Sequence, residues 1–380
     1  MLSRLQQISV FLAFGCALTV MFGMTISSSL HAESLKMTVL LPEQTPRSFW
    51  SESIAFMNAV AEDLGIDLDM VASQATSTYA IKKDGLSITN RNNPPDYILT
   101  GYWNSAIEQV MESAQNKGIR VFFFNAPVDE RDKPKIQQPR QRFKNWIGQM
   151  SPDETTAGYE LACALLEHAT KLTTNTGSKA IQIAGLAGEN LSTVSITRET
   201  GLRRAVHEKG AVLNTVIGTS WQRDNAAKAT TQILKQYPDT TVIWAVSDGL
   251  ALGAIDLLKQ KNMQPGIDML VGGFDWSTEA IQAIRKSDMA ASMGGHFMEG
   301  GRAMILAFDY EHGEDFAAEL GTTILTRMRI MDQSNVEEYA KKLGDRNWEK
   351  VDFRKFSKFY NKELKHYDFS LKNLLHQLRD

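Results

Sequence analysis

Cysteine and histidine are scarce in this chain of 380 residues, and the common catalytic motifs are missing. The two cysteines are Cys16 and Cys163, and the seven histidines are scattered along the sequence. This usage excludes a small domain held by several disulfides and gives no spacing typical of a zinc or redox site. No G-x-S-x-G elbow, Walker loop, H-E-x-x-H or G-x-G-x-x-G sequence occurs. The sequence therefore predicts neither an enzyme nor a protein that holds a metal or another cofactor.

An excess of charge of one sign is also missing. The chain has 41 basic and 44 acidic residues, a formal net charge of -3 and a pI near 6.2. No block of Lys and Arg and no basic helix stands out, so we expect no nucleic-acid partner. The content of 43% hydrophobic and 22% charged residues is typical of a globular protein, and the length favours two domains.

The start of the chain has the pattern of a targeting segment. Arg4 is the only charged residue before Glu33, and the run between them is mostly apolar. A short polar stretch then leads to Ala32. This pattern predicts a cleavable secretory signal peptide over residues 1–32. An uncleaved membrane anchor is the alternative, because the apolar run approaches the length of a membrane span. Cleavage would leave Cys163 as the only cysteine, which indicates a buried structural thiol.

The stretch 241–288 shows most clearly how the chain is built. Residues 241–246 and 269–274 are short apolar runs typical of buried strands, and each is followed by a polar turn and a helical pattern. This β-α-β-α order indicates parallel strands covered by helices. The alternation recurs in both halves of the chain, so the sequence predicts an α/β fold of doubly wound parallel sheets. Ligands of such sheets bind outside the carboxyl ends of the strands.

Further strands and helices are expected along the rest of the chain. The predicted strands are 37–41, 66–71, 96–100, 119–124, 179–185, 211–218, 290–293 and 322–327. The predicted helices include 49–64, 105–117, 155–170, 195–209, 225–236 and 298–311.

Aromatic side chains gather where the predicted strands end and the next helices begin. They are Phe49, Trp50, Trp103, Trp221 and Trp276. A flat apolar ring beside polar residues can stack on a sugar-like ring or cover a small ligand. The alternative for each of these residues is a place in the hydrophobic core.

Arg198 is expected in the first turn of a helix, where the helix dipole disfavours a positive charge. A planar guanidinium can donate to adjacent ligand hydroxyls or to a carboxylate, which would explain the position by a binding role. The alternative is a surface ion pair with Glu199 or Asp248.

Polar residues directly follow other predicted strands. Ser247, Asp248 and Asp275 stand after two of them, and His296 follows a Gly-Gly link after a third. Asp275 can accept hydrogen bonds from ligand hydroxyls, or it can cap the helix that begins near Thr278. For Asp248 we expect the capping role. His296 is a candidate donor to a ligand, and the alternative is a structural histidine near a hinge.

Several segments together resemble the type I periplasmic binding proteins for sugars. The similarity extends over residues 37–327. It is carried by residues 247–254 and 271–275, by Arg198 with Gly201, and by residues 147–149 with Gly158. The resemblance implies two α/β lobes joined by a hinge of three crossings, with the ligand between the lobes.

The lobe boundaries that follow from this resemblance are discontinuous. The first lobe is expected over 37–145 plus 297–320, and the second over 147–294 plus 321–332. A C-terminal extension over 333–380, with no assigned role, is expected to pack on the second lobe.

The resemblance also implies which residues form the site. The first lobe would supply Phe49, Trp50 and Asn125, and the second would supply Arg198, Trp221, Ser247 and Asp275. Gly295 stands where sugar binders often have a hinge glutamine, so His296 would substitute for it. The family often has aspartate at the position of Asn125 and asparagine at that of Ser247. These departures argue against a simple ribose or galactose ligand.

One branch of the same superfamily, the autoinducer-2 receptors, shares part of the pattern. Trp50 and the segment 125–128 resemble that branch. The pair Phe274-Asp275 and the hinge residue Gly295 differ from it, so the sequence does not support that ligand.

The resemblance implies an exported protein of the periplasm that encloses a small polar, sugar-like ligand by hinge closure. It would present this ligand to the membrane permease of an ABC-type importer. The alternative is a sensory partner of a membrane signalling receptor such as a sensor kinase. A transcription regulator of this fold would need DNA-binding helices before residue 37, where the hydrophobic leader stands. We expect a monomer.

Overall fold

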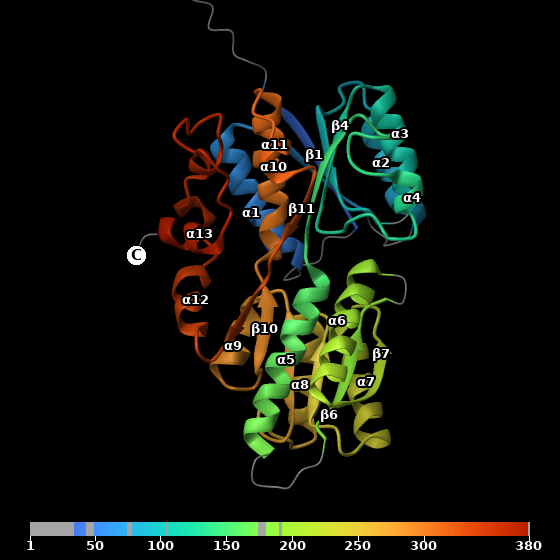
Figure 1. Ribbon diagram of the computed structural model, residues 1–380, viewed down its shortest axis with the longest axis vertical. Coiled ribbons are helices and arrows are strands. Elements are labelled where there is room, and N and C mark those ends of the chain that lie inside the picture. Colours follow the sequence, from blue (N-terminus) through green and yellow to red (C-terminus); the bar gives the residue numbers. More distant parts are fainter. Residues whose placement is uncertain are drawn as a thin grey trace, which may run out of the picture. The chain divides into compact units, whose positions relative to one another are not determined.

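The computed structural model describes residues 34–42, 49–73, 78–103, 105–173, 180–189 and 192–378. The predicted signal peptide and Cys16 lie outside these residues. Within the described ranges, no helix is long and apolar enough to cross a membrane. The strands form two six-stranded sheets, each flanked by helices (Figure 1).

The first sheet has the strand order β11-β5-β4-β3-β1-β2, and its pairings are parallel. Its strands are β1 (Lys36–Leu41), β2 (Asp67–Ala72), β3 (Tyr97–Thr100), β4 (Arg120–Phe124), β5 (Trp146–Pro152) and β11 (Thr323–Thr326). The helices beside it are α1 (Phe49–Leu64), α2 (Thr78–Thr89), α3 (Ile107–Asn116), α4 (Lys133–Ile136), α10 (Glu299–Glu311) and α11 (Ala317–Leu320). We call this sheet and these helices the first lobe.

The apolar run of β4 explains why the first sheet is covered on both faces. Phe122 and Phe124 belong to one hydrophobic cluster, whereas the alternate residues Val121 and Phe123 belong to another. Successive side chains of a strand point to opposite faces, so such a run requires an apolar partner on each face. Helices α1 and α10 supply core residues to the first cluster, and α2 and α3 supply them to the second.

The second sheet has the order β12-β10-β9-β8-β6-β7, and only β12 among its described strands is antiparallel to its neighbour. Its strands are β6 (Gln182–Ala187), β7 (Val212–Gly218), β8 (Val242–Ala245), β9 (Leu270–Phe274), β10 (Ala291–Gly294) and β12 (Arg329–Asp332). Its helices are α5 (Glu154–Thr173), α6 (Thr193–Lys209), α7 (Arg223–Gln236), α8 (Asp248–Gln260) and α9 (Thr278–Arg285). We call this unit the second lobe. The predicted α/β architecture of two doubly wound sheets is confirmed.

The chain passes between the two sheets three times. The crossings follow β5, lie at the short helix η1 (His296–Met298), and connect β11 with β12. The predicted boundaries differ from this arrangement, because they place residues 147–152 and 323–326 in the second lobe. Strand β11 instead pairs with β5, with Thr323 opposite Gln149, and both strands belong to the first sheet. A pairing between such distant segments leaves no local signal in the sequence.

The C-terminal extension also differs from its prediction, because it contacts both lobes. It contains α12 (Val336–Leu343), η2 (Trp348–Lys350), η3 (Phe353–Phe356) and α13 (Leu371–Gln377). The ring of Tyr339 packs on Trp276 of the second lobe, at 4.7 Å between centroids. The ring of Trp348 packs on Phe56 of the first lobe, at 5.1 Å. The extension therefore does not belong to the second lobe alone.

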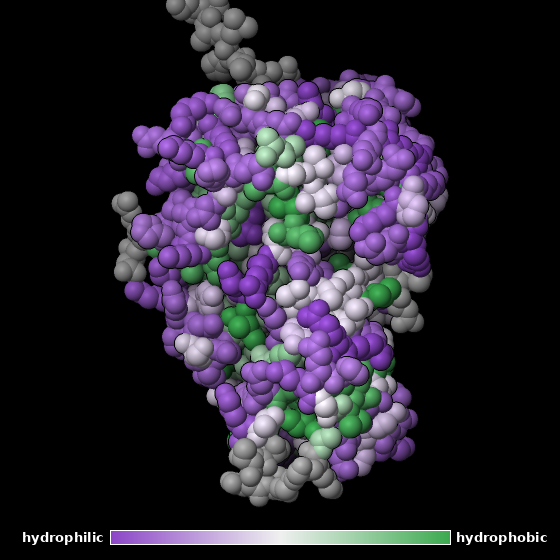
Figure 2. Space-filling view, viewed as in Figure 1, coloured by the Kyte–Doolittle hydropathy of each residue, from purple (hydrophilic) through white to green (hydrophobic). Residues whose placement is uncertain are grey.

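The face of the molecule in Figure 2 is mostly hydrophilic, with hydrophobic residues interspersed. Large hydrophobic side chains that are exposed in the described part of the chain come from separate elements, for example Tyr79, Val212 and Leu325. Isolated exposed apolar residues of this kind are ordinary for a globular protein.

Candidate functional site

Arg198 is buried in the second lobe and is held by a carboxylate that the sequence analysis did not single out. Its Nε lies 2.5 Å from Oε2 of Glu154, and its Nη2 lies 3.1 Å from Oε1 of the same residue. Its Nη1 donates to the carbonyl of Val246 at 2.7 Å. Both charged side chains are only 3% exposed. The predicted alternative of a surface ion pair with Glu199 or Asp248 is therefore wrong.

The close contact between helices α5 and α6 explains how Arg198 reaches Glu154. A Cβ atom on Gly158 would lie 2.1 Å from the carbonyl oxygen of Arg198, and one on Gly201 would lie 2.2 Å from that of Thr155. Glycine at both positions lets the helix backbones touch, since any side chain would force them apart. The approach brings Arg198, in the second turn of α6, beside the first turn of α5, where Glu154 stands.

His296 joins Arg198 to residues of both lobes. Its Nε2 lies 3.2 Å from Nη2 of Arg198 and 3.4 Å from Oδ1 of Asp275. Its ring stacks on Phe49 of the first lobe, with centroids 4.7 Å apart and an interplanar angle of 19°. The preceding Gly295 has a φ of 98°, a conformation that favours glycine, at the crossing between the lobes. The predicted hinge histidine thus lies among three predicted site residues.

Asp275 does not cap the following helix. The cap of α9 is Ser277, whose side chain accepts a hydrogen bond from the backbone N–H of Ala280. Asp275 has a φ of 115°, and its carboxylate is 16% exposed beside His296. A non-glycine residue in this backbone region is unusual and is often found at functional sites. The carboxylate is therefore left to accept from His296 or from a ligand hydroxyl.

Ser247 takes the helix-capping role that was expected of Asp248. Ser247 caps α8, where its hydroxyl oxygen accepts from the N–H of Leu250 at 3.3 Å. Asp248 is buried and accepts from the N–H of Ser277 at 2.8 Å and from the hydroxyl of Ser292 at 2.7 Å. Burial, with nearby Asp275, raises the pKa of Asp248 well above its usual value. Asp248 thus links the turn after β9 to strand β10, and the hydroxyl of Ser247 can still donate to a ligand.

The aromatic residues predicted on the first lobe lie close to one another. Trp50 packs edge to face on Trp103 at 5.5 Å and on Phe124 at 6.2 Å, and it also contacts Phe49 at 4.9 Å. The indole N–H of Trp103 donates to the hydroxyl of Thr100 at 3.0 Å. The rings of Phe49, Trp50 and Trp103 are partly buried, whereas the ring of Phe124 is fully buried.

Three other predicted residues occupy different surroundings. Asn125 ends β4 with a φ of 64° and is only 6% exposed. Trp221 follows the edge strand β7, and its ring packs against Gly188. Trp276 is fully buried, and its indole N–H donates to the carbonyl of Ser292 at 3.0 Å. Trp276 therefore belongs to the core rather than to a ligand surface.

Glu154 and Glu299 are two buried acids near the crossings that the sequence analysis did not identify. Burial raises the pKa of Glu299 to about 8, while the hydroxyl of Thr326 and the charge of Arg302 oppose this rise. Glu299 follows the crossing at η1, and Thr326 precedes the crossing from β11 to β12. Each acid is the first residue of a helix next to a crossing. That position along the chain is the sequence signal that could have identified both acids as candidates.

One direct hydrogen bond also joins the lobes away from the hinge. The hydroxyl of Thr193, at the start of α6, donates to Oδ2 of Asp129 at 3.1 Å. Asp129 follows β4 and precedes α4, so it belongs to the first lobe. The lobes thus contact each other both at the crossings and beyond them.

Similarity to known proteins agrees with this architecture. A family model described as "Periplasmic binding protein domain" matches residues 38–313. A periplasmic sugar-binding protein from Pseudomonas fluorescens superimposes with a TM-score of 0.79 and 28% sequence identity, over 90% of this chain and 99% of that one. A periplasmic solute-binding protein of an ABC transporter from Actinobacillus succinogenes, with bound D-allose, has a TM-score of 0.70. That pair is 18% identical, over 80% of this chain and 100% of that one, and shows the shared fold.

Curated relatives match over a smaller part of their length. The ribose import binding protein RbsB of Bacillus subtilis is 25% identical over 192 residues, which are 50% of this chain and 54% of the relative. The protein of the same name from Haemophilus influenzae is 27% identical over 116 residues, which are 30% of this chain and 37% of the relative. The chain thus spans about half the length of the first relative and less of the second. The family match and the two-lobed fold together show that this chain belongs to the periplasmic binding protein family and has its type I fold.

Proposed function

We propose that this protein is a solute-binding protein without enzymatic activity, which encloses a small polar, sugar-like ligand between its lobes by hinge closure. The observation that carries this proposal is the meeting of Phe49, Arg198, Asp275 and His296 at the crossing between the lobes. A ligand that touches residues of both lobes there stabilises the closed arrangement. The ring of Phe49 and the partly buried Trp50 and Trp103 offer apolar faces to a sugar ring.

The charges around Arg198 favour a neutral ligand. The carboxylate of Glu154 accepts from Nε and Nη2 of Arg198, and the carbonyl of Val246 accepts from Nη1. The pair is neutral overall, and the nearby Asp275 adds a negative charge rather than a positive one. An anionic ligand would therefore lack an uncompensated positive partner, whereas hydroxyl groups can donate to Asp275 and accept from the remaining N–H groups.

A thermal-shift screen with neutral sugars, polyols and small acids tests this proposal. A ligand that binds the folded state raises the unfolding midpoint by mass action, and we expect shifts with neutral polyhydroxylated compounds only. Asp275→Asn and Trp50→Ala should each abolish the shift while the unliganded protein stays folded. Asp239→Asn is the matched control, because Asp239 is exposed on the second lobe. Absence of any shift, or normal binding by both site variants, would contradict the proposal.

Delivery to the permease of an ABC-type importer is the second part of the proposal. It is supported by the import role in the names of the two ribose-binding relatives and by the ABC transporter context of the D-allose protein. Uptake of a labelled ligand by cells that contain or lack this protein tests it. Loss of uptake supports the importer role. Unchanged uptake, with a signalling response that disappears, would favour the sensory partner of a membrane receptor instead. The same cells show whether residues 1–32 are removed on export to the periplasm.

A further inference from the structure

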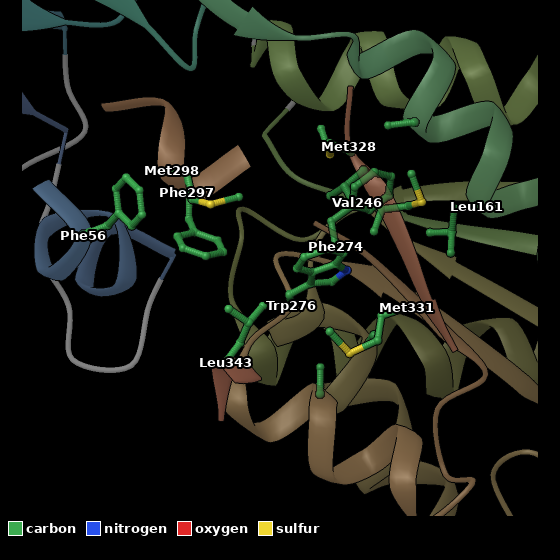
Figure 3. Packing of buried hydrophobic residues seen from close by; sticks show 14 of the residues in the cluster. Phe56, Leu161, Val246, Phe274, Trp276, Phe297, Met298, Met328, Met331 and Leu343 are labelled. Carbon is green, nitrogen blue, oxygen red and sulfur yellow. The ribbon is translucent and has the colours of Figure 1, made fainter. Parts of the chain in front are cut away.

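The segment 333–378 follows the last strand of both sheets and has one set of anchors on the second lobe. The side chain of Gln333 donates to the carbonyl of Ile284 and to the hydroxyl of Ser287. Glu337 pairs with Arg285 of α9 at 2.8 Å. Two buried residues of α12, Val336 and Leu343, complete the contact as members of the large hydrophobic cluster, and Figure 3 shows Leu343 in that cluster with Trp276.

A second set of anchors lies on the first lobe. The rings of Trp348 and Phe353 pack on Phe56 of α1, with centroids 5.1 and 5.0 Å away. The N–H of Phe353 donates to Oδ2 of Asp63 at 2.6 Å. The part of the chain after η2 runs beside α1 and α10 (Figure 1). Apolar contacts and a hydrogen bond to a carboxylate thus hold this part to the first lobe.

Asp309 of α10 strengthens the anchor on the first lobe. Its carboxylate is fully buried and accepts from four groups of the segment, of which two are side-chain hydroxyls and two are backbone N–H groups. The donors are Ser357 Oγ, Lys358 N at 2.7 Å, Phe359 N at 3.2 Å and Tyr367 Oη at 2.9 Å. A buried carboxylate with this many donors fixes the backbone around it.

Arg346 lies between the two sets of anchors and contacts both lobes at once. Its Nη2 donates to the carbonyl of Trp276, which follows β9 in the second lobe. Its Nε lies 3.4 Å from Oε2 of Glu52 in α1, and its guanidinium lies 5.1 Å from the ring centre of Phe297 in the crossing. Phe297 itself packs on Phe56 and Trp348. The Arg346 side chain is only 10% exposed, and its Nε and Nη1 lack a hydrogen-bond partner among the described residues, so its contact with Glu52 is an ion pair without a hydrogen bond.

We propose that residues 333–378 form an interlobe strap, in which Arg346 restricts the angle between the lobes. A rotation of one lobe against the other about the crossings changes the distance between Glu52 and the carbonyl of Trp276. One guanidinium cannot then keep both partners, and a buried charge that loses a partner is destabilised. The strap therefore favours the angle at which both contacts exist. This step rests on the proposed function: a ligand that binds at this angle meets lobes that need less rearrangement, which lowers the free-energy cost of binding.

The width of the interlobe distance distribution in the ligand-free protein tests this inference, independently of whether a ligand is found. Spin labels at Asn116→Cys on α3 and Lys235→Cys on α7, in a Cys163→Ala background, report the separation by double electron-electron resonance. Asn116 and Lys235 are exposed. We expect a narrow distribution for the parent protein and a broader one, at least twofold in width, for Arg346→Met. Methionine keeps an apolar stem against Phe297 but removes the guanidinium.

Arg354→Met is the matched control. Arg354 is an arginine of the same segment that is 52% exposed, and its ion pair with Asp352 stays within the strap. The interlobe distance distribution of Arg354→Met should have the same width as that of the parent protein. Glu52→Gln removes the same bridge from the first lobe and should also broaden the distribution, so the test does not depend on one variant folding. Circular dichroism verifies the fold of each. Distributions of parental width in both Arg346→Met and Glu52→Gln would overturn the inference.

Discussion

Arg198 and Arg346 are both buried arginines near the crossings between the lobes, but their surroundings differ. Arg198 has a carboxylate on two edges of its guanidinium and a backbone carbonyl on another, and these partners belong to the second lobe. Arg346 has one backbone carbonyl and a more distant carboxylate, and these partners belong to different lobes. Burial lowers the pKa of Arg346.

The difference indicates that the same side chain serves two purposes. An arginine held by a carboxylate and a carbonyl of one lobe fixes the geometry of a site, because these acceptors belong to the same rigid unit. A partly partnered arginine between two lobes makes its contacts only at one interlobe angle. Arg198 should therefore contribute mainly to stability and to the geometry of the site. Arg346 should mainly limit the range of angles between the lobes.

The largest expected effect comes from removing the carboxylate beside Arg198. Glu154→Gln leaves a buried guanidinium without a charged partner, so we expect a loss of roughly 3–5 kcal/mol in the free energy of unfolding. Urea denaturation measures it. Glu167→Gln on the same helix is the control, because Glu167 is 60% exposed and pairs with Lys209 at the surface. That variant should lose less than about 1 kcal/mol. Equal losses of unfolding free energy in Glu154→Gln and Glu167→Gln would show that the buried Arg198–Glu154 pair stabilises the protein no more than a surface pair does.

A smaller effect is expected from separating α5 and α6. In Gly158→Ala, the new methyl group would meet the backbone carbonyl of Arg198, which cannot rotate away. We expect a loss of about 1–3 kcal/mol in the free energy of unfolding, as for other overpacked sites, together with weaker ligand binding. Gly249→Ala is the control, because only the hydroxyl of Ser247 lies near its Cβ position, at 3.9 Å. A loss in the control as large as in Gly158→Ala would contradict this account of the helix contact.

The smallest effect on stability is expected for Arg346→Met. The substitution removes a buried charge whose partners are incomplete, so the free energy of unfolding should change by no more than about 1 kcal/mol in either direction. Glu52 is 23% exposed, so water can solvate it once the arginine is gone. Urea denaturation in parallel with Glu154→Gln provides the comparison. A loss as large as that of Glu154→Gln would show that Arg346 contributes to stability as much as the Arg198–Glu154 pair does, which would contradict the comparison.

The sequence could predict the parts of the site that depend on strand ends. Asp275 and His296 were singled out because they follow predicted strands, and Arg198 because it stands early in a predicted helix. The structure brings all three together. Helix caps were harder to assign, because Ser247 and Asp248 are adjacent and both residue types cap helices. The structure gives the cap to Ser247. Whether these residues bind a ligand stays a prediction.

Features that depend on distant segments could not be predicted. The partner of Arg198 is 44 residues away, and the pairing follows from the close contact of two helices. Trp276 stands at a strand end like the other aromatic candidates, but Tyr339 of the C-terminal segment packs on it. Nothing in the residues of α12 indicates that the chain beyond this helix crosses to the first lobe.

The edge position of β11 has a consequence for how the chain folds. This strand completes the first sheet by pairing with β5, and its Thr323 contacts Gln149 across 174 residues of sequence. Contacts of such long range form slowly, because the ends of a long loop must first meet. Until then β5 is an unpaired sheet edge, a template on which other chains can add strands. The first sheet therefore contains β1 but cannot be completed until Thr326 at the end of β11 is available, and aggregation competes with folding during that interval.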